Sequence, residues 1–445
     1  MMLQCGSKPW QDSLLSTMKL RRRADKGQLS TFRPTGAVLG LVALGAALLS
    51  GCAGHPPSAG AAGTSSGCVQ GITGITRTAI KVGAIFPTTG PQGPFFSAVG
   101  SGILARFRAQ NDRGGVSGRT LQLVSADDGD GELENLSAAQ HLTSTEHVFG
   151  IIEATTNSDG SGAYLHQLGV PVTGWGITSA WGRYPNMFGY RYSTSPDLLG
   201  QPTTTVAAFI KARHGQRVAV LAGGATASVN FARQIIETLP AFGLTLAYQN
   251  LDESLGQTDY SFDAQAMRRG GVDTLVTALD TFSNIDVYKA ATAIGLHFKL
   301  GMLPAGYDSR LAAADGAILA GAYVALDWRP FELPVPAHRE FEAELAAVAP
   351  SVFPGQLAMV GWLSADVFIR GLEAAGGACP TRGAFIANLR KVRDYTANGL
   401  LPPTNFSAVF GQMPLCYWEL EIHAGGFTPA GAQPFCGTLY RAPTR

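Results

Sequence analysis

The sequence predicts an α/β protein made of two lobes, each with a parallel sheet flanked by helices. Three observations carry this prediction. Short apolar runs alternate with amphipathic stretches from Ile80 onward, and strands that alternate with helices are typical of parallel sheets. The same alternation begins again after Pro196. The chain has 445 residues, of which 46% are hydrophobic, so it is long enough for two or three domains with large cores.

The first lobe is expected to hold five strands and the helices between them. Within residues 95–111, Val99, Ile103 and Phe107 recur every four residues, which places them on one face of a helix. A weaker pattern of the same phase predicts a helix over 132–143. The predicted strands are residues 80–86, 120–126, 148–152, 170–174 and 187–193.

The second lobe repeats this arrangement after a long helical pattern over 197–213. Its predicted strands are residues 216–222, 244–250, 273–279 and 298–303. Helices are predicted over 231–243 and 260–269, and a third ends at Gly295. Later in the chain, helices are predicted near 335–348, 356–376 and 381–392, and a β-like pair at 414–423 and 428–441.

The first fifty residues have the pattern of a targeting segment. A basic stretch, Met18–Arg23, precedes an apolar run of 14 residues, Gly36–Leu49. That length suits a signal peptide and is shorter than the roughly 20 residues of a membrane-spanning helix. We therefore expect residues 1–51 to be a signal peptide, with Met18 as an alternative start.

The end of this segment, Leu49-Ser50-Gly51-Cys52, resembles a bacterial lipobox. The resemblance implies cleavage before Cys52 and lipidation of its thiol and new amino group. An uncleaved or unlipidated signal with an incidental cysteine is the alternative. Several acyl chains hold a protein at a bilayer, whereas one chain holds it only marginally. Residues 52–74 are then a flexible, lipid-anchored tether on the extracytoplasmic side of the cell membrane.

Charge and motifs argue against a nucleic-acid partner and against catalysis. The first 51 residues hold seven Lys/Arg and two Asp/Glu, so residues 52–445 carry a net charge of −4, and no basic stripe is visible. The sequence lacks HExxH, GxxxxGK[ST] and GxGxxG motifs. We expect neither an enzyme nor a bound cofactor.

No metal site is expected either. The acidic stretch 127–134 invites comparison with a calcium loop, but an EF-hand register that starts at Asp128 puts Leu133 where glycine is required. Acidic residues in the first turn of a helix, where they favour the helix dipole, explain the stretch better. No Cys/His spacing typical of zinc sites is present.

Cys68, Cys379, Cys416 and Cys436 are expected to form disulfides, because disulfides persist outside the cytoplasm. Four cysteines allow three pairings. We predict Cys379–Cys416, which bracket one helix and loop of the tail. We also predict Cys68–Cys436, because chain ends often lie close together in compact folds.

The segment NDRGGVSGRTLQLVSADDG (111–129) closely resembles the first helix–turn–strand of the type I periplasmic-binding family, and in particular the leucine/isoleucine/valine-binding receptors of ABC importers. Gly114, Gly115 and Gly118 allow the tight turn that the strand follows. Further matches occur in order along roughly 75–375, and 376–445 resembles actinobacterial members. The other matching segments are IKVGAIFPTTGPQG, YPNMFGYRYSTSPDLLGQ, RVAVLA, DYSFDAQAMRRGGVDTLV and KAATAIGL.

The resemblance implies two Rossmann-like lobes joined by a three-crossover hinge. Lobe 1 would comprise 75–194 and about 326–378, and lobe 2 would comprise 195–325 and about 379–445. A small-molecule ligand would bind between the lobes of a monomer and pass to an ABC permease in the membrane. A ligand-sensing receptor of the same fold, without a transport role, is the alternative, since fold alone does not fix function.

Three first-lobe loops are expected at the ligand, because ligands of open α/β sheets bind outside the carboxyl ends of the strands. In the family, hydroxyl residues that match Thr155 and Thr156 bind a carboxylate at a helix start; simple N-capping is the alternative. The loop over 173–179 offers Trp175 as an apolar wall and Thr178 as a hydroxyl group. The remaining candidates of this lobe are Trp175, Thr178, Phe95 and Phe96.

The second lobe departs from the family's pattern. Amino-acid receptors place an aromatic residue at the position of Ala227, and the acid that holds the ligand's ammonium at the position of Ala305. Asp280 or Asp308 is a possible replacement for this acid; alternatively, the ligand lacks an amine and is apolar or aromatic. The candidate residues of this lobe are Asp280, Phe282, Tyr307 and Asp308.

Overall fold

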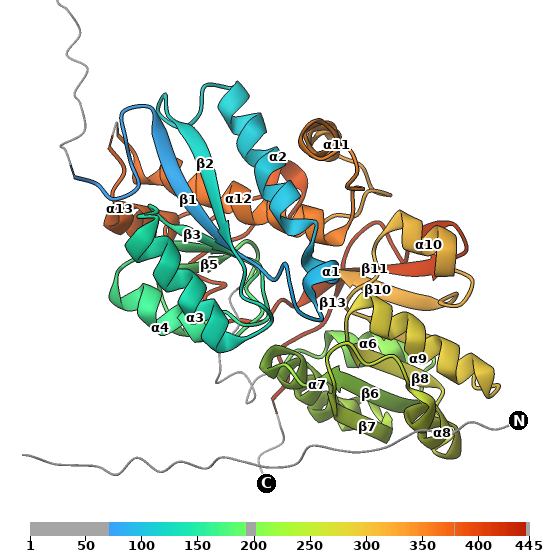
Figure 1. Cartoon of the computed structure of the whole chain (residues 1–445). Coiled ribbons are helices and arrows are strands. Elements are labelled where there is room, and N and C mark those ends of the chain that lie inside the picture. Colours follow the sequence, from blue (N-terminus) through green and yellow to red (C-terminus); the bar gives the residue numbers. More distant parts are fainter. Residues whose placement is uncertain (1–70, 193–201, 378, 442–445) are drawn as a thin grey trace, which may run out of the picture. The chain divides into compact units, whose positions relative to one another are not determined.

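The computed structural model of the chain describes residues 71–192, 202–377 and 379–441 (Figure 1). These residues all fall within the unit Thr64–Arg445. The signal segment, Cys52 and Cys68 lie outside the described residues. No helix within the described ranges is both long enough and apolar enough to cross a membrane.

Five parallel strands form the first sheet, in the order β2-β1-β3-β4-β5 (Figure 1). All five predicted strands are confirmed, although the last three are shorter than expected. The order reverses direction at β1, so the loops after β1 and β3 diverge and leave room for a ligand between them. The strands are β1 (Ala79–Ile85), β2 (Thr120–Ala126), β3 (Ile151–Glu153), β4 (Val172–Gly174) and β5 (Met187–Gly189).

The helices of this half include the predicted one over 95–111, which is divided in two. Pro94 begins the short helix α1, and α2 follows after a break at 97–98. The predicted helix over 132–143 is α3, which continues into a π-helical turn, His141–Thr145. The helices are α1 (Gly93–Phe96), α2 (Val99–Asp112), α3 (Glu132–Gln140), α4 (Asp159–Gln167) and α5 (Ala180–Arg183).

The second sheet has the order β12-β11-β10-β9-β8-β6-β7, with β13 paired to β11. Its strands from β6 to β10 are parallel, whereas β11, β12 and β13 add antiparallel pairs at one edge. The sequence patterns did not indicate β10. The strands are β6 (Arg217–Gly223), β7 (Thr245–Glu253), β8 (Thr274–Ala278), β9 (Leu300–Leu303), β10 (Ala322–Leu326), β11 (Cys416–His423), β12 (Gly426–Pro429) and β13 (Phe435–Cys436).

Five helices connect the parallel strands of this half or precede them. They are α6 (Thr205–Ala212), α7 (Thr226–Thr238), α8 (Ser261–Arg269), α9 (Thr281–Ala293) and α10 (Ser309–Asp315); a 3-10 turn, Leu239–Phe242, follows α7. The later helices are α11 (Pro336–Val348), α12 (Gln356–Ala375) and α13 (Arg382–Leu389).

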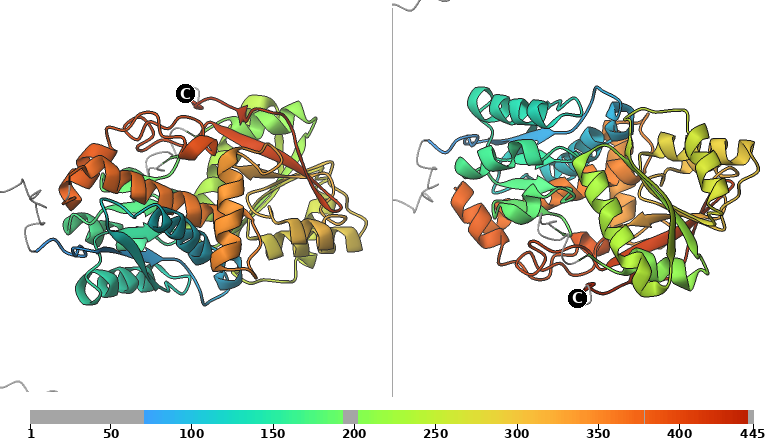
Figure 2. Two further views of the ribbon diagram at one scale, coloured as in Figure 1. Left: turned by 90° about the horizontal axis from the view of Figure 1, so that it is seen from above. Right: turned by 90° about the horizontal axis from the view of Figure 1, so that it is seen from below.

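Helix α12 lies in the core beside α2 (Figure 2). The two backbones approach closely, because a Cβ atom on Gly102 would collide with the Ala358 carbonyl group. A buried ion pair between Arg106 Nε and Asp366 Oδ1 (2.7 Å) joins the same helices. These contacts hold α12 in place, and with it Gln356 at its first turn.

The chain passes between the two sheets three times: from β5 to β6, from β10 to α11, and from α13 to β11. The first passage is hydrogen-bonded to the end of the third passage and to the segment after β13. Thr205 Oγ1 donates to the Leu415 carbonyl oxygen (2.8 Å), and Thr204 N donates to that of Thr438 (2.9 Å). The predicted fold class, two α/β lobes with parallel sheets and a three-crossover connection, is confirmed.

The tail is divided between the two halves, whereas the sequence assigned all of 379–445 to the second. Helix α13 packs on α12 in the first half, where the Phe385 ring meets those of Phe149, Phe188 and Phe368. Strands β11 to β13 extend the second sheet. Burial of Phe385, which is fully inaccessible to solvent, explains why α13 stays with the first sheet.

The two predicted disulfides are wrong. Cys416 is bonded to Cys436, because β11 and β13 are antiparallel and place these residues directly opposite each other. This bond excludes both Cys379–Cys416 and Cys68–Cys436. Cys379 is also disulfide-bonded.

Candidate ligand-binding site

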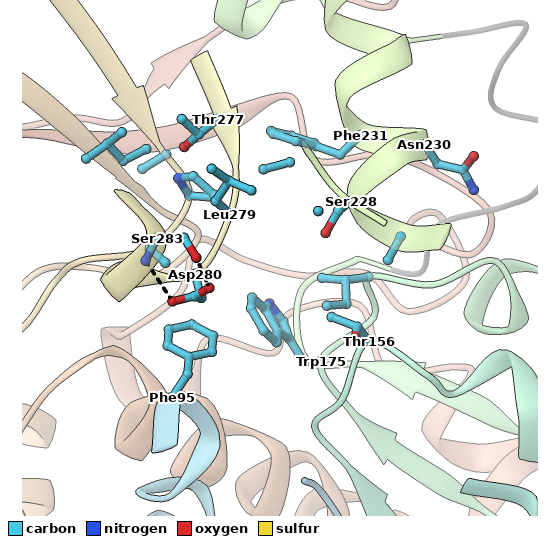
Figure 3. A pocket seen from close by; sticks show the side chains of 18 of the residues that line it. Phe95, Thr156, Trp175, Ser228, Asn230, Phe231, Thr277, Leu279, Asp280 and Ser283 are labelled. Atoms are coloured by element: carbon cyan, nitrogen blue, oxygen red, sulfur yellow. Dashed lines mark hydrogen bonds between the residues drawn. The ribbon is translucent and has the colours of Figure 1, made fainter. Parts of the chain in front are cut away.

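A pocket of about 210 Å³ is lined by residues of both halves (Figure 3). The first half contributes loops that follow β1, β3 and β4, together with the start of α12. The second half contributes the segments that follow β6, β8 and β9. Because all these loops leave the carboxyl ends of parallel strands, the pocket lies where ligands bind in open α/β sheets.

Three aromatic side chains form the wall contributed by the first half. Phe95 and Phe96 come from α1 and pack edge to face, with ring centroids 5.0 Å apart. Trp175 follows β4, and its ring lies 6.3 Å from that of Phe96. Figure 3 shows Phe95 and Trp175 facing Leu279, Asp280 and Ser228. All three predicted aromatic residues of this half therefore line the pocket.

The two adjacent threonines predicted to bind an anion have different surroundings. Thr155 is buried and does not line the pocket: its hydroxyl donates to Asp128 Oδ2 (2.5 Å) and accepts from the Asn157 amide (3.1 Å). Thr156 does line the pocket, and its Oγ1 has no hydrogen-bond partner within the described part of the chain. Only Thr156 is placed to meet a ligand.

Thr178 is not among the lining residues, although its neighbours Ile177 and Ser179 are. The side chain is 3% exposed, and its hydroxyl makes no hydrogen bond to another described residue. The Ser179 hydroxyl donates to Asp159 Oδ2 (2.9 Å). The loop after β4 therefore presents the positions on either side of Thr178 to the pocket.

Asp280 lines the pocket, but its carboxylate caps α9. Oδ1 accepts from the amides of Phe282 (2.8 Å) and Ser283 (3.1 Å), and Oδ2 accepts from the Ser283 hydroxyl (2.6 Å). These bonds satisfy donors that a helix start leaves free. Phe282, in the next turn, is 51% exposed and lies outside the pocket lining.

Tyr307 and Asp308 also lie outside the lining. The Tyr307 ring packs against those of Trp328, Phe331 and Phe427, and its hydroxyl donates to Glu332 Oε2 (2.6 Å). Asp308 caps α10 and forms an ion pair with Arg310 (2.9 Å). Both side chains are occupied by structural contacts.

Ala305 and Ala227 do line the pocket. The sequence comparison had singled out these positions as ones where an amino-acid receptor carries an acid and an aromatic residue. Because Ala305 has no polar atom in its side chain, this wall offers a ligand no ammonium-binding group at that point.

Several lining residues were missed from the sequence. Helix α7 contributes one face, with residues at positions 227, 228, 230, 231 and 234. Their spacing fits one side of a helix, a signal that could have been found. The start of α12 and the three passages contribute others. The missed polar residues include Gln92, Ser228, Asn230, Gln234, Ser254, Thr277, Gln356, Tyr192, Asp327 and Tyr417.

The described lining residues include two carboxyl groups, Asp280 and Asp327, and no Lys, Arg or His. Asp327 is buried and accepts from the Tyr190 hydroxyl at 3.0 and 3.1 Å. Burial raises the pKa of Asp327, and the nearby Arg191 guanidinium offsets this only in part. Behind Thr155, burial likewise raises the pKa of Asp128, and it raises that of Glu153 to about 7. Negative charge is therefore poorly solvated around the first wall.

No group of three or more His, Cys, Asp or Glu side chains is arranged to hold a metal ion in the ranges that the structure covers. The acidic stretch 127–134 enters α3, and Glu132 and Glu134 lie in the first turn of that helix. Asp127 accepts from the amides of Thr88 (2.8 Å) and Thr89 (3.3 Å), which fixes the loop after β1.

Solved structures with the same fold include three solute-binding proteins. A fatty acid ABC transporter substrate-binding protein from Thermomonospora curvata is 18% identical, with a TM-score of 0.68 over 82% of this chain and 94% of that one. A solute-binding protein from R. palustris in complex with benzoate is 18% identical, with a TM-score of 0.65 over 82% and 98%. A branched chain amino acid ABC transporter from Thermus thermophilus with bound valine is 16% identical, with a TM-score of 0.68 over 81% and 96%.

At these identities the likeness concerns the fold alone. No curated protein sequence matches the chain. The family model described as periplasmic binding protein matches residues 79–426, which include both sheets and the pocket. The chain therefore belongs to the periplasmic binding protein family.

Proposed function

We propose that this protein is the solute-binding component of an ABC importer, and that it captures a small apolar ligand between its two lobes and delivers it to a membrane permease. The observation that carries the proposal is the pocket, whose walls come from the strand ends of both sheets. Such a pocket encloses a ligand only when the two walls come together, as they do when two lobes close about a hinge.

The walls already touch at the rim of the pocket. Gly256, in the loop after β7, packs so near Pro91 that a Cβ atom on the glycine would lie 3.3 Å from the Pro91 Cβ. A ligand enters only when these loops separate. The proposed cycle is therefore opening at Pro91 and Gly256, entry, closure over the aromatic wall, and release at the permease.

Among the ligand classes expected from the sequence, the lining supports an apolar or aromatic compound over an amino acid. Ala305 provides no acid for an ammonium group, and the walls are formed largely by carbon. Burying apolar area contributes about 25 cal/mol per Å², so such a ligand binds without an ammonium clamp. The fatty acid and the benzoate for which two of the similar structures are named lack an amino group as well.

A screen of small molecules tests the binding role. The purified mature protein, in detergent, is mixed with amino acids, aliphatic and aromatic acids, alcohols and amides, and its melting temperature is recorded. We expect apolar members to raise it, because a ligand that binds only the folded state stabilises that state. Loss of uptake of the same compound by cells that lack the protein supports import; binding without any effect on uptake favours a sensor.

We further propose that Cys52 carries the lipid that anchors the protein, as a monomer, to the outer face of the cell membrane. Replacement of Cys52 by alanine is expected to move the protein from the membrane fraction to soluble or unprocessed forms, measured by fractionation and immunoblotting. Cys5→Ala is the matched control and should leave the distribution unchanged. Tight membrane retention of the Cys52→Ala variant contradicts the anchor.

A further inference from the structure

Gln356 brings an unused hydrogen-bond acceptor to the pocket wall. It opens α12, is 7% exposed and lines the pocket. Its Nε2 donates to the Pro304 carbonyl oxygen (2.9 Å), and its backbone amide donates to that of Tyr307 (3.1 Å). Because a carbonyl oxygen only accepts, the first bond fixes which end of the side-chain amide is the oxygen. That oxygen, Oε1, has no partner among the described residues.

A second buried side-chain amide comes from the other half, and within the described ranges no hydrogen bond fixes which of its ends is the oxygen. Gln234, on α7, is 6% exposed, lines the pocket and leaves its Oε1 without a hydrogen bond inside the described ranges. A buried acceptor with no donor costs about 1–3 kcal/mol. A ligand hydroxyl or amide N–H would recover part of that cost, whereas a carboxylate has no donor to give.

The charges of the lining residues act in the same direction. Asp280 and Asp327 line the pocket, Asp128 and Glu153 lie behind Thr155, and no cationic side chain is among the described lining residues. The Arg191 guanidinium lies near Asp327, whose carboxyl group it partly compensates. A carboxylate in this space would be desolvated near other carboxyl groups. An ammonium group would find Asp280 already accepting three hydrogen bonds.

We infer that the ligand is a neutral apolar molecule whose head group donates a hydrogen bond, such as an alcohol or an amide, and that Gln356 is the residue that selects it. This inference rests on the proposed solute-binding function and narrows it. Trp175 and Phe95 would pack against the carbon skeleton of the ligand, and Gln356 would accept a hydrogen bond from its head group.

The test uses probes that share one skeleton and differ in the head group: 3-phenylpropan-1-ol, 3-phenylpropanamide, 3-phenylpropanoate, 3-phenylpropylamine, L-phenylalanine and propylbenzene. Titration calorimetry of the full mature protein at pH 7 gives their affinities. We expect the alcohol and the amide to bind at least tenfold more tightly than the carboxylate, the amine and the amino acid. A tighter carboxylate, amine or amino acid overturns the inference but leaves the proposed function standing. If no probe binds, the inference is overturned, whereas the proposed function fails only if the broader screen also yields no ligand.

Variants test the role of Gln356. Gln356→Leu should weaken the alcohol about 5- to 100-fold, as the loss of a hydrogen bond to a buried group implies, and should change propylbenzene less than threefold. Gln234→Leu gives the same measurement from the opposite wall. Gln433→Leu, at an exposed position outside the lining, is the matched control. Unchanged affinity for the alcohol in folded Gln356→Leu protein rules out the assignment of this residue.

Discussion

The two walls of the pocket are built from different side chains. The wall of the first half is aromatic, and the Phe96 ring contacts those of both Phe95 and Trp175. The facing wall combines small residues such as Ala227, Ser228 and Ala305 with larger apolar ones, among them Phe231, Leu279 and Met302. Rings that pack on one another have few ways to rearrange, whereas small residues leave space. The comparison suggests that the first wall orients a ligand and the second sets how large it can be.

The two halves also differ in how they treat buried acids. Glu153 of β3 accepts a hydrogen bond from the Ser161 hydroxyl (2.7 Å), whereas neither carboxylate oxygen of Glu419 in β11 has a partner among the described residues. Burial raises the pKa of Glu153 to about 7 and that of Glu419 to about 8. Glu153, near the ligand loops, is thus partly stabilised by a hydrogen-bond donor. Glu419, in the second sheet, has no such donor among the described residues and avoids a buried charge by staying protonated.

Filling the space before the second wall should have the largest effect. Ser228 is half-buried and faces the first wall, so Ser228→Trp should place an indole where the ligand lies (Figure 3). We expect at least a hundredfold loss of affinity for the best ligand of the screen, measured by calorimetry. Ser228→Ala keeps the space open and serves as the control. Retained binding in the tryptophan variant would mean that the second wall does not limit ligand size.

Removing a ring from the first wall should have the next largest effect. Trp175→Ala is expected to weaken binding about 10- to 100-fold, because a fully buried large apolar side chain contributes about 1.5–3 kcal/mol. Phe282→Ala is a suitable control, since this ring is exposed and outside the pocket. Equal losses in the two variants would contradict the assignment of the aromatic wall.

The adjacent threonines should separate stability from binding. Thr155→Val removes the donor to buried Asp128 and should lower the free energy of unfolding by about 1–3 kcal/mol, with little change in affinity. Thr156→Val should leave stability nearly unchanged and weaken a polar ligand about 2- to 10-fold. Denaturant unfolding and calorimetry measure the two effects. A reversed pattern would return Thr155 to the ligand site.

The last prediction concerns how stability changes with pH. Glu419 is protonated in the folded protein up to about pH 8 and loses its proton near pH 4.5 when unfolded. The folded state therefore binds the extra proton between these values, and stability falls as pH rises through them, by at most about 1.4 kcal/mol per pH unit. Glu419→Gln should flatten this decline in urea unfolding between pH 5 and 8. Glu153→Gln should flatten the decline over a narrower pH range, because the pKa of Glu153 is raised only to about 7. Equal slopes in the two variants would refute the difference between the acids.

The sequence predicted the parts of the fold that short-range patterns determine. Apolar runs of strand length marked β1 to β9, and the loops after β1, β3 and β4 yielded the aromatic wall and Thr156. A residue between a strand and a helix can either cap the helix or contact a ligand. The sequence therefore could not show that Asp280 and Asp308 are helix caps. Only the tertiary structure shows which donors they meet.

Contacts between distant segments were beyond the sequence. Tyr307 belongs to a cluster with Trp328 and Phe427, and these partners come from separate stretches of the chain. The Cys416–Cys436 bond depends on the register of β11 against β13, which four cysteine positions do not determine. Gln356 was missed because its value lies in an oxygen left unpaired, and pairing is a property of the folded state.

The bond from Thr205 to the Leu415 carbonyl group joins the first passage to the end of the third and reduces the number of ways in which the lobes can move. Two connecting segments that are bonded to each other move as one unit, and the Cys416–Cys436 bond fixes β11, where the third passage ends, to β13. Unconnected segments would allow the lobes to slide and twist, whereas connected ones allow mainly a single rotation. Ligands of different length would then differ only in the angle at which closure of the lobes stops.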